Sequence, residues 1–125
     1  MNVVDSSGWL EYFADGPNAA FFASAVERPA SLVVPTLSLY EVFKRILQQR
    51  DESAALQAVA LMQQGVVVDL TAPVALGAAK LSMVTGLPLA DSIMLATAQT
   101  FDALFWTQDA DFEKLEGVRY IAARA

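Results

Sequence analysis

The sequence predicts an α/β fold, a three-layer α/β/α sandwich with a mainly parallel central sheet. Short β-branched runs alternate with longer segments whose apolar residues recur at helical spacing along all 125 residues. Strands that alternate with helices are typical of a parallel sheet covered on both faces. No repeat, linker or low-complexity segment interrupts the alternation, so we expect one domain over residues 1–125.

The elements follow in order from local patterns. Apolar runs predict five strands, at residues 2–4, 31–35, 65–70, 103–106 and 118–121. Helical spacing and helix-end signals predict helices over residues 6–13, 17–26, 36–50, 52–64, 72–84 and 87–99, with a short one near 111–115.

Residues with known end preferences set the helix boundaries. Pro17 suits the first turn of the second helix, and Asp51 is a candidate N-cap of the fourth. Thr71 is a candidate cap of the fifth helix, with Pro73 in its first turn. Gly86 and Pro88 interrupt the chain at the start of LPLADSIMLATAQ, a segment whose residues are nearly all apolar or small and whose only charge is Asp91.

Composition narrows the chemistry. The chain has no Cys and no His, which excludes thiol nucleophiles, Ser-His-Asp triads and imidazole metal ligands. Its net charge of −6 argues against a simple nucleic-acid-binding module. Any catalysis must therefore use carboxylates, hydroxyls, Lys, Arg or Tyr. Metal sites built from oxygen ligands alone favour hard ions such as Mg²⁺ or Mn²⁺.

Apolar content bears on location and partners. No uncharged apolar run approaches the roughly 18 residues of a membrane span, and the first residues lack the positive flank of a signal peptide. We therefore expect a cytoplasmic protein with no membrane contact. An apolar fraction of 55% in a chain this small also suggests contact with another chain.

Five acidic residues are expected at one edge of the sheet. Asp5 directly follows the first strand, Asp109 and Asp111 follow the fourth, and Glu41 and Asp91 lie near helix starts. Strand ends and helix starts share one edge of a parallel sheet, and this is where functional crevices form. Carboxylates that converge without a His repel one another unless a cation lies among them, which predicts a divalent metal site.

Each acid also has a purely structural interpretation. Asp5 or Asp91 could cap a helix, and Glu41 could pair with Lys44 and Arg45 along its own helix. Residues Leu87, Met94, Leu95 and Ala98 should share a face with Asp91 and leave its carboxylate partly hydrated, which favours function there.

The same alternative applies near the fourth strand. Asp109 or Asp111 could stabilise a short helix through its dipole. Thr107 and Ser6 could be ordinary hydroxyls at strand ends. The joint placement of these groups, rather than any one of them, supports a site.

Four segments in series resemble a known family. VVDSS, LSLYEVFKR, LPLADSIMLATAQ and LFWTQDADFEKLEGVRYI together are similar to the PIN domain, and more narrowly to a VapC-type toxin of a bacterial or archaeal toxin–antitoxin pair. The resemblance covers essentially the whole chain. It implies a PIN-like α/β/α fold, a Mg²⁺- or Mn²⁺-dependent endoribonuclease acting on RNA, a cognate VapB-like antitoxin as partner, and a homodimer.

The resemblance also implies roles for residues of this chain. Asp5, Asp91 and Asp109 would hold the metal, and Glu41 would bind a second ion or orient the attacking water. Three further residues are secondary candidates: Asp111, Thr107 and Ser6. Lys44 and Arg45 lie within a turn of Glu41; a solvated helix face is the favoured interpretation over phosphate binding.

The early helices contain a group of aromatic residues, Trp9, Tyr12, Phe13, Phe21 and Phe22. Most should be core, but they are too many for one short helical pair to bury alone. Because the family uses its early helices to hold an antitoxin segment, we expect some of these rings to line such a groove.

Two other functional classes fit parts of the pattern. The alternative to a ribonuclease is a non-catalytic PIN-fold interaction module with a degenerate site, against which the full set of acids argues. A phosphoryl-transfer domain also places Asp at strand ends. Its dehalogenase form usually shows D-x-D after the first strand, where this chain has DSS, and the paired acid and late Lys of a receiver domain are not evident.

Overall fold

The computed structural model describes residues 1–125 and contains five short parallel strands. They are β1 (Asn2–Val4), β2 (Val33–Pro35), β3 (Val66–Val68), β4 (Leu104–Thr107) and β5 (Val118–Tyr120). Strands β1, β4 and β5 pair in that order, and β2 pairs with β3. A parallel bridge between Asn2 and Leu32 joins the two sets, which gives the spatial order β3-β2-β1-β4-β5. All three ladders are parallel, as the sequence predicts.

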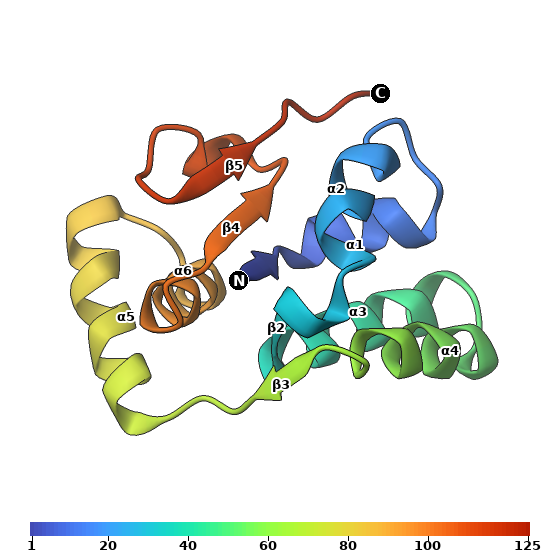
Figure 1. Cartoon of the computed structure of the whole chain (residues 1–125), viewed down its shortest axis with the longest axis horizontal. Helices are drawn as coiled ribbons and strands as arrows, with labels where there is room; N and C mark the ends of the chain where they lie inside the picture. The colour runs from blue at the N-terminus through green and yellow to red at the C-terminus, as the bar shows by residue number, and fades with distance from the viewer.

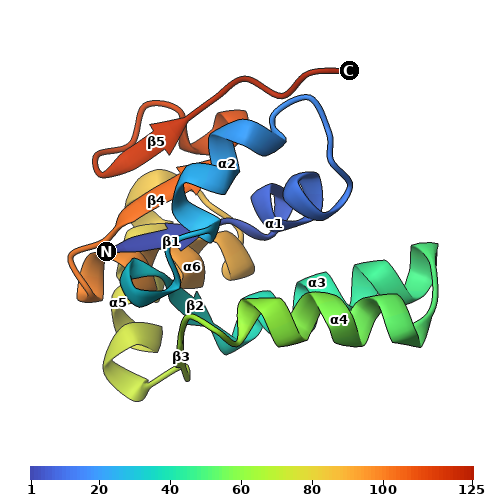
Figure 2. The same ribbon diagram turned by 45° about the vertical axis from the view of Figure 1, so that its right-hand side comes forward.

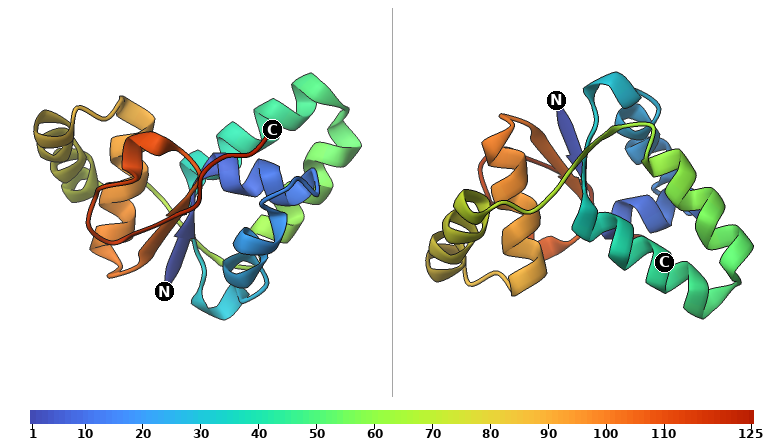
Figure 3. Two further views of the ribbon diagram at one scale, coloured as in Figure 1. Left: turned by 90° about the horizontal axis from the view of Figure 1, so that it is seen from above. Right: turned by 90° about the horizontal axis from the view of Figure 1, so that it is seen from below.

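Helices cover both faces of this sheet and confirm the three-layer sandwich. They are α1 (Ser6–Phe13), α2 (Ala19–Val26), α3 (Thr36–Gln49), α4 (Glu52–Met62), α5 (Ala72–Thr85) and α6 (Leu89–Thr100). Figures 1 and 3 show α5 and α6 on one side of the strands and α1 to α4 on the other. In Figure 2 the antiparallel pair α3 and α4 extends away from the sheet.

Each face of the sheet has its own hydrophobic core. The larger core packs α1, α2, α3 and α4 against the sheet and includes Trp9, Phe22 and Met62. The smaller core lies under α6 and includes Leu95 and Phe105. The two cores hold the strand ends from both sides, so side chains that project from those ends have fixed positions.

Several helix boundaries agree with the sequence, but α2 and α6 each begin two residues later than predicted, at Ala19 and Leu89. Asp51 caps α4 by accepting a hydrogen bond from Ala54 N at 2.8 Å, and Thr71 Oγ1 accepts from Val74 N at 3.4 Å. The prediction that Pro17 lies in the first turn of α2 is wrong, because this helix begins at Ala19. The second, third and fifth predicted strands are shorter in the structure, and a 3-10 turn, η1 (Pro29–Ser31), takes up the start of the second. The short helix predicted near residues 111–115 is a 3-10 helix at Ala110–Phe112.

Gly8 permits the close approach of α1 to α2. A Cβ added at Gly8 would lie 2.5 Å from Cε1 of Phe22 and 2.9 Å from Cγ1 of Val4, both of which are fully buried. Such overlap in a close-packed core forces neighbouring side chains out of their preferred rotamers.

The Gly8→Ala substitution should therefore lower the free energy of unfolding by about 1–3 kcal/mol, as for other overpacked cores. Gly77→Ala is the matched control, because Gly77 lies within α5 and has nothing within 4 Å of an added Cβ. That control should raise the free energy of unfolding by roughly 0.5–1 kcal/mol through the helix propensity of Ala. Urea denaturation measures both, and equal effects would contradict the packing argument.

None of the helices alone combines the length and the apolar character needed to cross a membrane. The consecutive helices α5 and α6 meet those criteria only when taken together, and the chain bends by 114° between them.

Candidate active site

Asp5 lies at the exit of β1 and is buried, with 6% of its surface exposed. Its Oδ2 atom accepts hydrogen bonds from Thr107 Oγ1 at 2.8 Å and from Ser7 Oγ at 3.1 Å. Burial raises the pKa of this carboxyl group above its usual range, although the two hydroxyl donors oppose the shift. Asp5 occupies the N-cap position of α1, but its side chain makes no capping hydrogen bond.

The loop after β4 carries two further acids. Thr107 is fully buried, and its Oγ1 accepts from Asp109 N at 2.9 Å while donating to Asp5. Asp109 Oδ1 accepts from Asp111 N at 2.9 Å and so caps the short 3-10 helix η2 (Ala110–Phe112). One oxygen of Asp109 therefore stabilises a short helix, as its structural interpretation predicts. Thr107 links the same loop to Asp5 through its hydrogen bonds to both residues.

Glu41 projects from α3 toward the start of α1. Ser6 Oγ donates to Glu41 Oε1 at 2.7 Å, across 35 residues of sequence. Lys44 instead lies near Tyr40, with its Nζ 3.4 Å from the phenolic oxygen and 5.6 Å from the ring centroid. Glu41 therefore contacts Ser6 across the site, and Lys44 contacts Tyr40 rather than Glu41.

Asp91 lies in the first turn of α6 and is half-buried, as the sequence predicts. Its side chain caps no helix. Burial raises its pKa to about 6, and the negative charges of four other carboxylates add to the increase, those of Asp5, Asp109, Glu41 and Asp111. A carboxyl group that responds to all four of these acids lies among them.

The structure thus gathers the five predicted acids around one edge of the sheet, which we call the acid rim: Asp5, Glu41, Asp91, Asp109 and Asp111. Their side chains do not stand close enough for any three to chelate one ion without moving. The donor set nevertheless fits a hard divalent ion, because it consists of carboxylate oxygens alone. Burial, and then repulsion from the neighbouring carboxylates, raises the pKa of Asp91. A cation among these groups would relieve that repulsion.

Sequence reasoning missed one hydroxyl at the rim. Ser7 donates to Asp5, whereas its neighbour Ser6 donates to Glu41. The adjacent hydroxyls of D-S-S, directly after the first strand, were the available signal.

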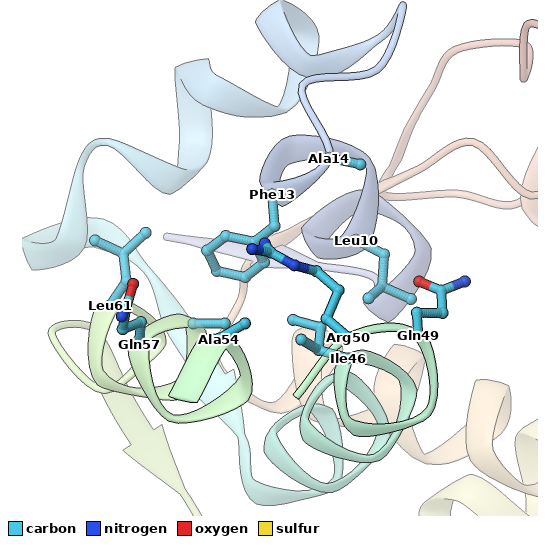
Figure 4. Close-up of a pocket in the computed structure, with 10 residues that line it drawn as sticks. Leu10, Phe13, Ala14, Ile46, Gln49, Arg50, Ala54, Gln57 and Leu61 are labelled. Atoms are coloured by element: carbon cyan, nitrogen blue, oxygen red, sulfur yellow. The ribbon is translucent and has the colours of Figure 1, made fainter. Parts of the chain in front are cut away.

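A groove lies between α1 and the pair α3 and α4, with a volume of about 420 Å³. Figure 4 shows its walls, from which Phe13 and Leu10 project on one side and Leu61 on another, while Arg50 extends into the groove from the end of α3. The remaining lining residues are Ala14, Ile46, Gln49, Ala54, Gln57 and Ala58. Most of this surface is apolar.

The aromatic group divides between core and groove. Trp9 and Phe22 are buried, with 1% and 0% of their surfaces exposed. Tyr12, Phe13 and Phe21 are half-buried, and Phe13 alone of the five lines the groove. Trp9 and Phe13 stack at 5.7 Å between ring centroids, as their spacing on one helix face predicts.

Comparison with known families identifies the class of protein. Residues 3–118 match the family model of the PIN domain. The chain therefore belongs to the PIN domain family. No curated protein sequence matches it.

Solved structures with the same fold include several toxins. The chain is similar to a toxin–antitoxin complex from Klebsiella pneumoniae, with a TM-score of 0.80, 20% identity, and coverage of 95% of this chain and 96% of that one. It is also similar to VapC20 of Mycobacterium tuberculosis, a toxin that cleaves the sarcin-ricin loop, with a TM-score of 0.77, 16% identity, and coverage of 93% and 95%. The DNA-bound VapBC of Salmonella typhimurium gives a TM-score of 0.74 at 12% identity, covering 98% of each chain. At these identities the likeness establishes the fold.

Proposed function

We propose that this protein is a metal-dependent endoribonuclease and the toxin of a VapC-type toxin–antitoxin pair, acting in the cytoplasm. The observation that carries the proposal is the acid rim of a PIN-family chain, where Asp91 has its pKa raised to about 6 by burial and by four neighbouring carboxylates. The toxins of similar fold support the same assignment.

The residues of the rim would have separate roles in metal binding, in orienting water and in positioning Asp5. Asp5, Asp91 and Asp109 would hold one or two ions, either directly or through bound water. Mg²⁺ or Mn²⁺, when bound, supplies a Lewis acid that lowers the pKa of a water molecule and neutralises charge on the phosphate. Glu41, fixed by Ser6 at 2.7 Å, would orient or deprotonate that water. Thr107 would keep the Asp5 carboxylate in place.

Purified protein incubated with total RNA tests this proposal. We expect cleavage with Mg²⁺ or Mn²⁺, none in excess EDTA, and recovery when the ion is restored. Expression in a bacterial host should arrest growth, and Asp5→Asn should relieve the arrest while the circular dichroism spectrum stays unchanged. Cleavage that persists in EDTA would rule out a metal mechanism. A parent that cuts no RNA under any of these conditions would favour the non-catalytic interaction module.

We further propose that the groove between α1, α3 and α4 receives a segment of a VapB-like antitoxin encoded by a neighbouring small reading frame. Support comes from its apolar walls and from the complexes formed by proteins of similar fold. The segment would present apolar side chains to Phe13 and Leu61.

Leu61→Glu should weaken binding of that antitoxin by roughly tenfold or more, because it places a charge on an apolar wall. RNA cleavage by the free protein should not change. Leu56→Glu is the matched control, since Leu56 lies on the same helix, is 53% exposed and does not line the groove. Isothermal titration with the purified antitoxin measures both variants. An unchanged affinity for Leu61→Glu would place the partner elsewhere.

A homodimer is also part of the proposed function. Large apolar side chains are exposed on α5 and α6, where Leu76, Met83 and Leu89 expose 69%, 88% and 78% of their surfaces. Large apolar side chains that are exposed to this extent on neighbouring helices support a contact with another chain. Sedimentation velocity at micromolar concentration tests the dimer, and a monomer under those conditions would contradict it.

A further inference from the structure

Asn18 is a buried polar residue outside the acid rim, with 2% of its surface exposed. It occupies the N-cap position of α2, where Asn commonly accepts a hydrogen bond from the helix. Its side chain makes no such bond. Its Nδ2 instead donates to Gln108 Oε1 at 2.9 Å and to the carbonyl oxygen of Ala122 at 3.0 Å.

These two acceptors follow neighbouring strands: Gln108 comes directly after β4, and Ala122 comes shortly after β5. Gln108 stands between Thr107, which donates to Asp5, and Asp109. Ile121, the residue between β5 and Ala122, donates its N–H to the carbonyl oxygen of Thr107 at 3.1 Å. The side chain of Asn18 is therefore hydrogen-bonded to the chain just after β4 and just after β5. Figures 1 and 2 show the last residues running beside the connection between α1 and α2.

The backbone of Asn18 is itself fixed. Its N–H donates to Glu11 Oε2 at 2.7 Å, and its carbonyl accepts from Phe21 N at 3.1 Å. The side-chain amide therefore starts from an anchored position on the α1–α2 connection.

Stability alone does not account for this residue. Oδ1 of Asn18 is buried and has no hydrogen-bond partner in the protein. Burying an amide that is only half satisfied costs free energy relative to an apolar side chain of similar size. What the amide supplies, and an apolar group cannot, is a directional link between the α1–α2 connection and the loop that carries Asp109.

We propose that Asn18 is a positioning residue for the acid rim, acting through its hydrogen bonds to Gln108 and Ala122. It sets where Asp109 stands relative to Asp5, and so how readily the rim takes up a divalent ion. This inference rests on the proposed function for its catalytic consequence. Its structural consequence can be measured independently.

The test uses Asn18→Ala, Gln108→Met and the double variant. Gln108→Met removes the acceptor at nearly constant side-chain size, and Gln64→Met is the matched control on an exposed glutamine. The first readout is hydrogen exchange of the Asp109 amide, which donates to Thr107. We expect exchange to quicken by roughly tenfold in Asn18→Ala and Gln108→Met and to stay unchanged in the control, because local opening sets this rate.

The second readout is Mn²⁺ binding by calorimetry, together with kcat and KM on RNA. Small displacements of catalytic groups lower turnover strongly, so we expect kcat to fall about tenfold with KM nearly unchanged. The double variant should lose no more than Asn18→Ala alone, since both substitutions break the same link. Mn²⁺ affinity should fall in parallel.

The outcomes separate the two ideas. A lower melting temperature in Asn18→Ala with unchanged Asp109 exchange and unchanged kcat would show a merely structural role and overturn the proposal. A parent that neither binds Mn²⁺ nor cleaves RNA would overturn the proposed function, and Asp109 exchange would then decide the positioning role by itself. Gln108 is half-buried, so Gln108→Met keeps the test open should Asn18→Ala fail to fold.

Discussion

Asp91→Asn should lower RNA cleavage by roughly a hundredfold or more, because removing a preorganised charge from a site of this kind has effects of that size. The amide keeps the shape of the side chain but holds a divalent ion far less well than a carboxylate. Cleavage of a labelled RNA at saturating Mn²⁺ measures the effect.

The matched control is Asp102→Asn, the same chemical change at the opposite edge of the sheet, just before β4. Asp102 has a φ of 53°, a conformation that Asn tolerates well. The Asp102→Asn variant should cleave RNA like the parent. Equal losses in both variants would point to a general effect of charge on RNA binding, and full activity in Asp91→Asn would refute the metal-site assignment.

The second expected result concerns stability in the presence of chelator. The pKa of Asp91 is raised from 3.8 to about 6, and that of Asp5 is raised as well. The folded protein therefore binds protons more tightly than the unfolded chain at these groups. Their contribution to stability is fully present below about pH 4 and is lost as the pH rises through the folded-state pKa.

In EDTA the melting temperature should thus rise when the pH falls from 7.5 to 5. The part due to Asp91 is roughly 2–4 °C, kept small because this carboxyl group is half exposed and screened by solvent. Asp91→Asn should flatten this dependence, and Mn²⁺ at pH 7.5 should stabilise the parent more than the variant. Differential scanning calorimetry provides the measurement. A parent that loses stability as the pH falls from 7.5 to 5, with the same slope in Asp91→Asn, would show that burial and the neighbouring charges do not raise the pKa of Asp91.

The fold could be predicted from the sequence because its signals are local. Valine runs such as Val66–Val68 and caps such as Asp51 act within a few residues of themselves, so a single sequence contains them. The start of α2 could not be predicted in this way. Asn18, the residue after Pro17, has its N–H bound to Glu11 and its side chain turned toward Gln108, both of which are tertiary contacts.

The placement of the acids in the candidate site could also be predicted from the sequence, but their hydrogen bonds could not. That the acids would share one edge followed from the topology of a parallel sheet, which makes Asp5 and Asp109 neighbours once their strands pair. The hydrogen bonds that fix them did not follow. The Ser6–Glu41, Asn18–Gln108 and Thr107–Asp5 contacts span 35, 90 and 102 residues, and no sequence pattern specifies which hydroxyl or amide meets which carboxylate or carbonyl across such separations.

The hydrogen bond between Thr107 and Asp5 also has a consequence for synthesis. Asp5 leaves the ribosome early, whereas Thr107 and Asp109 emerge 102 and 104 residues later in the chain. Because β4 pairs with β1 and leads directly into Thr107 and Asp109, the rim cannot form in a nascent chain that lacks this strand. On the proposed function, a translation product that stops before β4 should cleave no RNA, because Thr107 and Asp109 are then missing from the rim.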